Sequence, residues 1–152
     1  MLLYEFEGKQ LFKDCGIEIP KSQLVESRDS SLTLGMTGGV VLKAQVLSGF
    51  RAGAGGIVKV TQGVIPDLIR DLFKKTVNGE KVEKVLVEEA IDFEKEYYLS
   101  FSYSTDTRSP VLTFGEGGTG VEDKEAVVFP VNILEGYQGE NIPPELKDTA
   151  RK

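Results

Sequence analysis

The sequence predicts an α+β fold made mainly of antiparallel sheet with flanking helices. Two observations indicate this class. Residues 40–60 hold two apolar strands joined directly by a glycine-rich turn, and further strands follow one another after residue 82. Helical spacing of apolar residues is limited to a few separate segments, whereas a parallel doubly wound sheet alternates strands with helices throughout. The length of 152 residues suits one domain or two small subdomains.

Periodicity assigns the elements of the first forty residues. Residues 4–15 place their apolar side chains on one helical face, and Gly16 ends this helix. An extended segment at 17–20 leads into a short strand at 23–25. The polar residues 26–35 include several helix-capping side chains, which favours a short irregular helix.

The clearest amphipathic helix spans residues 64–77. Its apolar positions recur at helical spacing, Pro66 suits its first turn, and Asp67 suits its positively polarised N-terminus. Asn78 and Gly79 then turn the chain.

Strands dominate the rest of the chain. We expect them at residues 82–91, 96–104, 110–114 and 127–132. The second of these alternates apolar and polar side chains, so we expect its apolar stripe to lie in the core: Tyr97, Leu99, Phe101 and Tyr103. A loop at 136–144 and the first turns of a helix at 144–152 complete the assignment.

Composition limits the classes of function. The net charge of −6 opposes nucleic-acid binding, which needs clustered lysine and arginine. No apolar run approaches the ~20 residues of a membrane-spanning helix, and the acidic N-terminus does not resemble a signal peptide. A single cysteine, Cys15, excludes an internal disulfide, so we expect a reducing, cytoplasmic location. The chain has no histidine, and any histidine chemistry must come from a partner.

Lys43 is the most informative single residue. It interrupts the apolar strand at 40–47, where an ammonium group loses its hydration unless a negative partner replaces it. The following turn, residues 48–56, carries Arg51 and several glycines whose backbone can approach an anion closely. Together the strand and the turn predict a site for a phosphate-like anion.

Three alternatives accompany this hypothesis. Lys43 can lie at a strand edge with its ammonium group in water. Glu88 and Glu89 can be surface acids on an edge strand. A G-x-G-x-x-G pattern at residues 115–120 formally fits a dinucleotide-binding turn, but no helix or βαβ unit is expected around it.

Several short segments, taken in order, resemble one family. They lie at residues 4–12, 16–20, 41–46, 55–56, 86–90, 94–99 and 116–122. Together they resemble the ATP-grasp region of the β subunit of succinyl-CoA synthetase and its relatives, the NDP-forming acyl-CoA synthetases and ATP-citrate lyase. The resemblance implies an ATP-grasp fold with two α+β subdomains, one formed by residues 21–90 and an incomplete second formed by residues 1–20 and 91–152.

The resemblance also implies roles for particular residues. Lys43 corresponds to the lysine that meets the α- and β-phosphates, and Glu96 to the carboxylate that binds the ribose hydroxyls. Residues 50–52 match the loop that closes over the phosphates, while Glu88 lies beside the adenine and Ile91 contacts the base. The complete implied set of nucleotide-binding residues is Lys43, Phe50, Arg51, Ala52, Glu88, Ile91 and Glu96.

The chain departs from the family pattern in two ways. Phe50 stands where relatives usually have glycine, and Gly53 stands where they have lysine. In addition, the asparagine and aspartate that bind Mg²⁺ in the family, a glutamate near its phosphorylated histidine, and its CoA-ligase domain have no counterpart in these residues.

The implied function is the nucleotide-binding portion of an ADP- or NDP-forming acyl-CoA synthetase, an acid–thiol ligase similar to succinate–CoA ligase. ATP or GTP, with Mg²⁺, would phosphorylate a histidine on an α subunit or domain that also carries the CoA site. We expect this chain alone to be inactive and its exposed core to favour self-association. The alternative is a non-catalytic split or truncated half that acts as an interaction module. The acid substrate and the choice between ATP and GTP are not specified by these residues.

Overall fold

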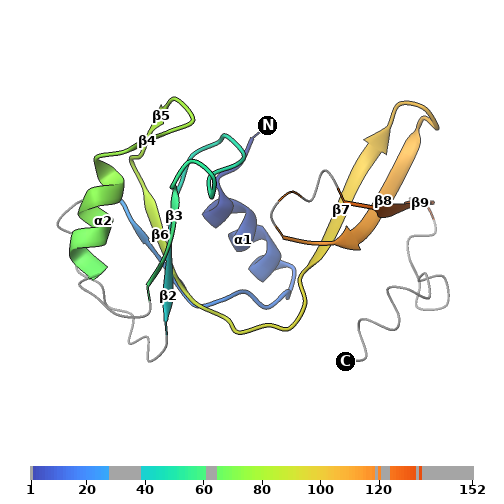
Figure 1. Cartoon of the computed structure of the whole chain (residues 1–152). Coiled ribbons are helices and arrows are strands. Elements are labelled where there is room, and N and C mark those ends of the chain that lie inside the picture. Colours follow the sequence, from blue (N-terminus) through green and yellow to red (C-terminus); the bar gives the residue numbers. More distant parts are fainter. Residues whose placement is uncertain are drawn as a thin grey trace. The chain divides into compact units, whose positions relative to one another are not determined.

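The computed structural model describes residues 2–27, 39–60, 65–118, 120, 124–132 and 134. Contacts divide the chain into two compact units, unit 1 at Met1–Asp92 and unit 2 at Phe93–Lys152, and each is described by itself. Unit 1 combines helices with antiparallel strands, and unit 2 contains a further antiparallel sheet (Figure 1), which confirms the predicted α+β class. Among the described residues, no helix has the length and apolar character needed to cross a bilayer.

Unit 1 is built on a four-stranded antiparallel sheet with the order β1-β6-β2-β3. The strands are β1 at Ser22–Val25, β2 at Val40–Ala44, β3 at Ile57–Val60 and β6 at Val85–Glu89. Because β2 and β6 are the inner strands, Lys43 and Glu88 do not lie on sheet edges. Glu88 is only 5% exposed, so the alternative that it is a surface acid on an edge strand is wrong.

The register gives this sheet two different faces. Successive side chains of a strand alternate between faces, and helix α2 at Ile65–Phe73 packs on the apolar one. The core on this side is made of Val40, Leu42, Ala44, Val85 and Val87 from the sheet with Ile69, Leu72 and Phe73 from α2. Lys43 and Glu88 therefore point to the opposite face, where helix α1 at Glu5–Asp14 lies (Figure 1).

Helix α1 confirms the helix expected at residues 4–15. Gly16 follows it with a φ of 79°, the left-handed conformation typical of a helix stop. None of its residues is buried, and Leu11 and Phe12 are more than half exposed. Ion pairs from Glu5 and Lys9 join this helix to the sheet.

The helix expected at residues 64–77 is shorter in the structure, since α2 ends at Phe73. Thr76 and Val77 instead form strand β4, which pairs with β5 at Glu80–Lys81. Asn78 and Gly79 both have positive φ, 50° and 85°, and form the tight turn between these strands. The turn that follows Thr76 and Val77 therefore places this β-branched pair in a hairpin with β5 and not in the helix.

Unit 2 contains a three-stranded antiparallel sheet with the order β7-β8-β9. The strands are Tyr97–Ser104, Ser109–Glu116 and Ala126–Pro130. The prediction that the stripe on β7 is core is wrong, because Leu99 is 56% exposed and Phe101 and Tyr103 are each 65% exposed. The pattern of alternation is present, but no helix of the described part of unit 2 covers this face.

Some predictions fall outside the described residues. These are most of the irregular helix at 26–35, the loop at 136–144 and the helix at 144–152. The subdomain boundaries at 1–20, 21–90 and 91–152 also stay predictions.

Candidate functional site

The strand lysine singled out by sequence lies between two carboxylates of unit 1. Lys43 Nζ is 2.6 Å from Glu88 Oε1 on β6 and 2.9 Å from Glu5 Oε1 on α1. The Lys43 side chain is 19% exposed and that of Glu88 only 6%. The anion that the sequence requires for Lys43 is therefore supplied, in this structure, by the protein itself.

Glu5 also binds the arginine of the glycine-rich turn. Its Oε2 accepts a hydrogen bond of 2.8 Å from Arg51 Nη2, while its Oε1 is 3.0 Å from Lys9 Nζ. Burial alone would raise the pKa of the Glu5 carboxyl, but the hydrogen bond and charge of Lys43, with the charge of Lys9, lower this pKa to about 2. Glu5 is thus ionised at neutral pH.

Lys9 completes the cluster by pairing with Glu88 as well as Glu5. Burial lowers the pKa of the Lys9 amine, the charge of Glu5 acts in the opposite direction, and the charge of Lys43 lowers the pKa further. Around these pairs the described residues gather three cations and two carboxylates. One positive charge remains in excess, which suits the approach of an anion.

A buried glutamine joins α1 to the strand that carries Lys43. The Gln45 side chain accepts a hydrogen bond from the Phe6 amide at 3.2 Å and donates one to the Lys43 carbonyl at 3.1 Å. Gln45 is 3% exposed, so both bonds are protected from water. They fix the first turn of α1, and with it Glu5, against β2.

The glycine-rich turn presents part of its backbone as free donors. The amides of Ala54, Gly55 and Gly56 donate to carbonyls within the turn itself. In contrast, the amides of residues 49–53 have no acceptor among the residues that the structure describes. A run of unpaired amides next to Arg51 is a typical feature of a phosphate-binding loop.

Phe50 occupies this turn in a strained conformation. Its φ is 55°, a value that favours glycine, and its side chain is 75% exposed. This conformation costs a phenylalanine free energy that a glycine in its place would not lose.

The turn is anchored from the β4-β5 hairpin. Glu80 accepts hydrogen bonds from the amides of Leu47 and Ser48 at 3.0 and 2.9 Å, and the first of these is the main cause that lowers the pKa of the Glu80 carboxyl. Asn78 Nδ2 donates to the Gly49 carbonyl at 2.6 Å. These bonds hold the start of the turn while residues 50–53 extend beyond it.

The structure brings together three of the seven predicted nucleotide-binding residues. Lys43, Arg51 and Glu88 meet in the cluster around Glu5. Phe50 and Ala52 are exposed neighbours of Arg51 in the turn, and Ile91, which is 56% exposed, follows the end of β6. The seventh residue, Glu96, belongs to unit 2.

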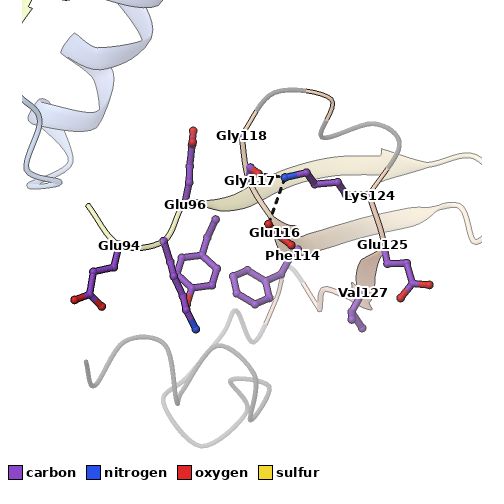
Figure 2. Close-up of a pocket in the computed structure, with 12 residues that line it drawn as sticks. Glu94, Glu96, Phe114, Glu116, Gly117, Gly118, Lys124, Glu125 and Val127 are labelled. Carbon is purple, nitrogen blue, oxygen red and sulfur yellow. Dashed lines mark hydrogen bonds and ion pairs between the residues drawn. The ribbon is translucent and has the colours of Figure 1, made fainter. Parts of the chain in front are cut away.

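Glu96 lines a cavity of about 700 Å³ at one end of the unit 2 sheet (Figure 2). The cavity walls include Tyr97, whose ring stacks on Phe114 with centroids 5.6 Å apart. Its polar lining comes from the backbone of the glycines at 115, 117 and 118 and from Glu94, Lys95, Glu96, Glu116, Lys124 and Glu125.

The backbone of the Glu-Gly-Gly segment, residues 116–118, lies against Glu96. The Gly117 amide donates to the Glu96 carbonyl at 2.8 Å, and a Cβ on Gly117 would lie 2.8 Å from the Tyr97 backbone. Gly118 has a φ of 96° and passes close to the Glu96 carboxylate. Lys124 closes the segment by donating to the Gly117 carbonyl at 2.6 Å (Figure 2). Among the described residues, the motif leads from β8 to the antiparallel strand β9 and does not open a βαβ unit. Its glycines position a carboxylate instead.

Sequence reasoning missed Glu5, Lys9 and Gln45 as members of the site. Glu5 and Lys9 stand four residues apart on α1, so their side chains share one helical face. The spacing of these two opposite charges, four residues apart within a weakly amphipathic helix, is the sequence signal that could have indicated them. Nothing in the sequence indicates that Gln45 is buried.

Among the described residues, no group of three or more acids or cysteines is placed to hold a metal ion. The described side chains of unit 1 offer electrostatic binding through Lys43 and Arg51. Two cations from a strand and a turn, with free amides beside them, can bind and orient a polyphosphate.

Comparison with known proteins identifies the family to which the chain belongs. The ATP-grasp domain family matches residues 2–135. The succinate–CoA ligase (ADP-forming) subunit beta of Methanocaldococcus jannaschii is 44% identical over 127 residues, covering 81% of this chain and 34% of the relative. That of Bacillus subtilis is 31% identical over 181 aligned positions, covering 100% of this chain and 46% of the relative. The chain thus spans less than half the length of these relatives.

Solved structures share the fold. The dinucleotide forming acetyl-coenzyme A synthetase 1 of Ca. Korarchaeum cryptofilum, in complex with coenzyme A, acetyl-coenzyme A and a phosphorylated phosphohistidine segment, superposes with a TM-score of 0.64 at 20% identity, covering 92% of this chain and 62% of that one. ATP citrate lyase from Methanothrix soehngenii, in complex with citrate and coenzyme A, gives 0.62 at 17% identity, covering 89% and 36%. The predicted ATP-grasp fold is confirmed, and the chain belongs to the ATP-grasp domain family, with β subunits of ADP-forming succinate–CoA ligase among its sequence relatives.

Proposed function

We propose that this chain binds the phosphates of ATP or GTP as the nucleotide-binding portion of an acyl-CoA synthetase of the succinate–CoA ligase type. The observation that carries the proposal is the convergence of Lys43 and Arg51 on one carboxylate, beside the unpaired amides of residues 49–53. Two cations and a set of backbone donors are what a polyphosphate requires.

The remaining predicted residues supply the rest of the nucleotide site. Glu88 and Ile91 flank the end of β6, where the adenine would lie, and Glu96 accepts hydrogen bonds from the ribose hydroxyls. Mg²⁺, when bound with the nucleotide, would offset phosphate charge. This chain's own contribution is to hold the α- and β-phosphates while the γ-phosphate stays accessible.

The reaction then proceeds on a partner. A histidine nitrogen of an α subunit or domain attacks the γ-phosphorus, and ADP or GDP leaves. The phosphoryl group passes to a carboxylate substrate to form an acyl phosphate, and the CoA thiol displaces phosphate to form the thioester. The absence of histidine from this chain, the subunit-beta names of its relatives and the phosphohistidine segment in one structural neighbour support this division of labour. The cytoplasmic location also stays a prediction.

Titration of ATP–Mg into isotope-labelled protein, followed by NMR, tests the site. We expect weak binding, with a dissociation constant above roughly 0.1 mM, and shifts centred on Lys43 and residues 50–52. Lys43→Met should weaken binding tenfold or more, whereas Lys74→Met, which removes an exposed lysine just after α2, should not. Shifts confined to other residues, or sub-micromolar affinity that survives Lys43→Ala, would contradict the proposed site.

A second candidate function is a non-catalytic half that acts as an interaction module. The exposed stripe of Leu99, Phe101 and Tyr103 favours it, because such apolar patches commonly mark interfaces. Sedimentation should show self-association that Phe101→Ser reduces and Leu11→Ser, an exposed change on α1, does not. Monomeric wild-type protein at high concentration would argue against this role.

A further inference from the structure

We propose that Glu5 is a positioning residue, which holds Lys43 and Arg51 side by side so that both can meet one phosphate chain. The inference rests on the proposed function but concerns a residue on α1 that lies outside the strand and turn predicted to bind nucleotide. Glu5 uses one carboxylate oxygen for each cation, at 2.9 Å for Lys43 and 2.8 Å for Arg51. No other described acid contacts both.

The two cations come from elements that have no other direct tie between their charged groups. Lys43 lies on β2, and Arg51 lies in the turn whose residues 49–53 have unpaired amides. Arg51 has one further bond, from Nη1 to the Ala44 carbonyl at 3.2 Å. Since Lys9 brings a third positive charge to Glu5, the cations would repel one another without this carboxylate.

Binding to Glu5 still leaves donors for a ligand. The Lys43 ammonium has three N–H donors, of which the structure assigns two, to Glu5 and Glu88. The Arg51 guanidinium has five, of which two are assigned. Glu5 therefore orients both groups and still leaves N–H donors on each that can bind a ligand. In protein kinases a helix glutamate likewise pairs with the lysine that meets the nucleotide phosphates, although it holds only that one cation.

A purely structural role for Glu5 is the competing explanation. An acid in the first turn of a helix stabilises the helix through its dipole, whatever else it contacts. Glu7 provides the matched control, because it lies in the same turn and its carboxylate accepts a hydrogen bond from the Tyr4 amide at 2.9 Å. Glu7→Gln removes the same charge, keeps an acceptor for that amide and leaves the cations untouched.

The first measurement follows the side chain of Arg51 without any ligand. In wild-type protein the Nε–H signal of the Arg51 guanidinium, which is assigned by its loss in Arg51→Lys, should show the restricted motion of an ordered side chain. We expect Glu5→Gln to release this side chain, so that its signal averages, while Glu7→Gln leaves it unchanged. An Arg51 signal that is equally ordered in Glu5→Gln would overturn the proposal, whether or not nucleotide binds.

The second measurement compares ATP–Mg with adenosine. Glu5→Gln should weaken ATP–Mg binding about tenfold and leave adenosine binding unchanged, since adenosine has no phosphates. In an Arg51→Met background the effect of Glu5→Gln should become smaller, because Glu5 acts through Arg51. Equal loss for both ligands, or unchanged or tighter ATP–Mg binding, would refute positioning. If wild-type protein binds no ATP–Mg at all, the proposed function fails, and the Arg51 signal still decides whether Glu5 holds the cations.

Discussion

Lys43 Nζ lies 2.6 Å from Glu88 Oε1, which joins β2 to β6 on the sheet face opposite the apolar core. Residues that the family resemblance assigns to different parts of a nucleotide are therefore bound to each other here. A buried ion pair of this kind contributes little net stability when intact, because desolvation offsets attraction, but breaking it leaves an uncompensated charge. Removing either Lys43 or Glu88 should therefore lower the stability of the fold, because the other charge stays buried without this partner.

Glu88→Gln should destabilise unit 1 by about 2–3 kcal/mol. Lys43 and Lys9 would each lose an ionic partner, although both would keep Glu5. Urea unfolding monitored by circular dichroism measures the change. The control is Glu89→Gln on the same strand, expected within about 0.5 kcal/mol of wild type, and equal effects of the two variants would argue against a special role for the pair.

The pH dependence of stability should report the ionisation of Glu5. Its folded pKa of about 2 lies below the ordinary value of 4.5. Its contribution is therefore complete above about pH 4.5 and is lost as the pH falls toward 2, up to about 3 kcal/mol in total. The stability difference between wild type and Glu5→Gln should shrink between about pH 5 and pH 2.5. A difference that stays constant over this range would contradict the lowered pKa.

Phe50→Gly should raise the free energy of unfolding by up to about 1 kcal/mol. The native φ of 55° is unfavourable for phenylalanine and not for glycine, and this relief exceeds the entropy that glycine adds to the unfolded chain. Phe50→Ala is the control, since it removes the exposed ring but keeps the unfavourable φ. If thermal unfolding shows that the alanine variant gains as much as the glycine variant, backbone strain is not the cause.

Gly117→Ala should destabilise the β7-β8 pair by about 1–3 kcal/mol. The added Cβ would meet the Tyr97 backbone at 2.8 Å, which cannot move aside as a flexible side chain would. Faster amide hydrogen exchange along β7 and β8 checks this expectation. Gly8→Ala, with open space around its Cβ in α1, should instead stabilise its helix by about 0.5–1 kcal/mol, and unchanged exchange in Gly117→Ala would contradict the close packing.

Local patterns predicted the elements well where neighbours in sequence decide them. The hairpin of β2 and β3 and the turn at Asn78 and Gly79 follow from short-range chemistry, and the structure confirms both. The C-terminal end of α2 was placed too late because β-branched Thr76 and Val77 fit either a helix face or a strand, and the pairing with β5 decided between them. Period-two alternation on β7 predicted a strand, but it does not reveal whether another layer covers the apolar face.

The sequence by itself determined the α+β class, the family resemblance and the demand of Lys43 for an anion. Only the tertiary structure decided which anion this is. Glu5 and Glu88 lie 38 and 45 residues from Lys43 along the chain and reach it because strand register and the Gln45 contacts of α1 bring three elements to one face. A charge in an apolar strand indicates that a partner is needed, but its identity depends on packing between segments that no local pattern connects.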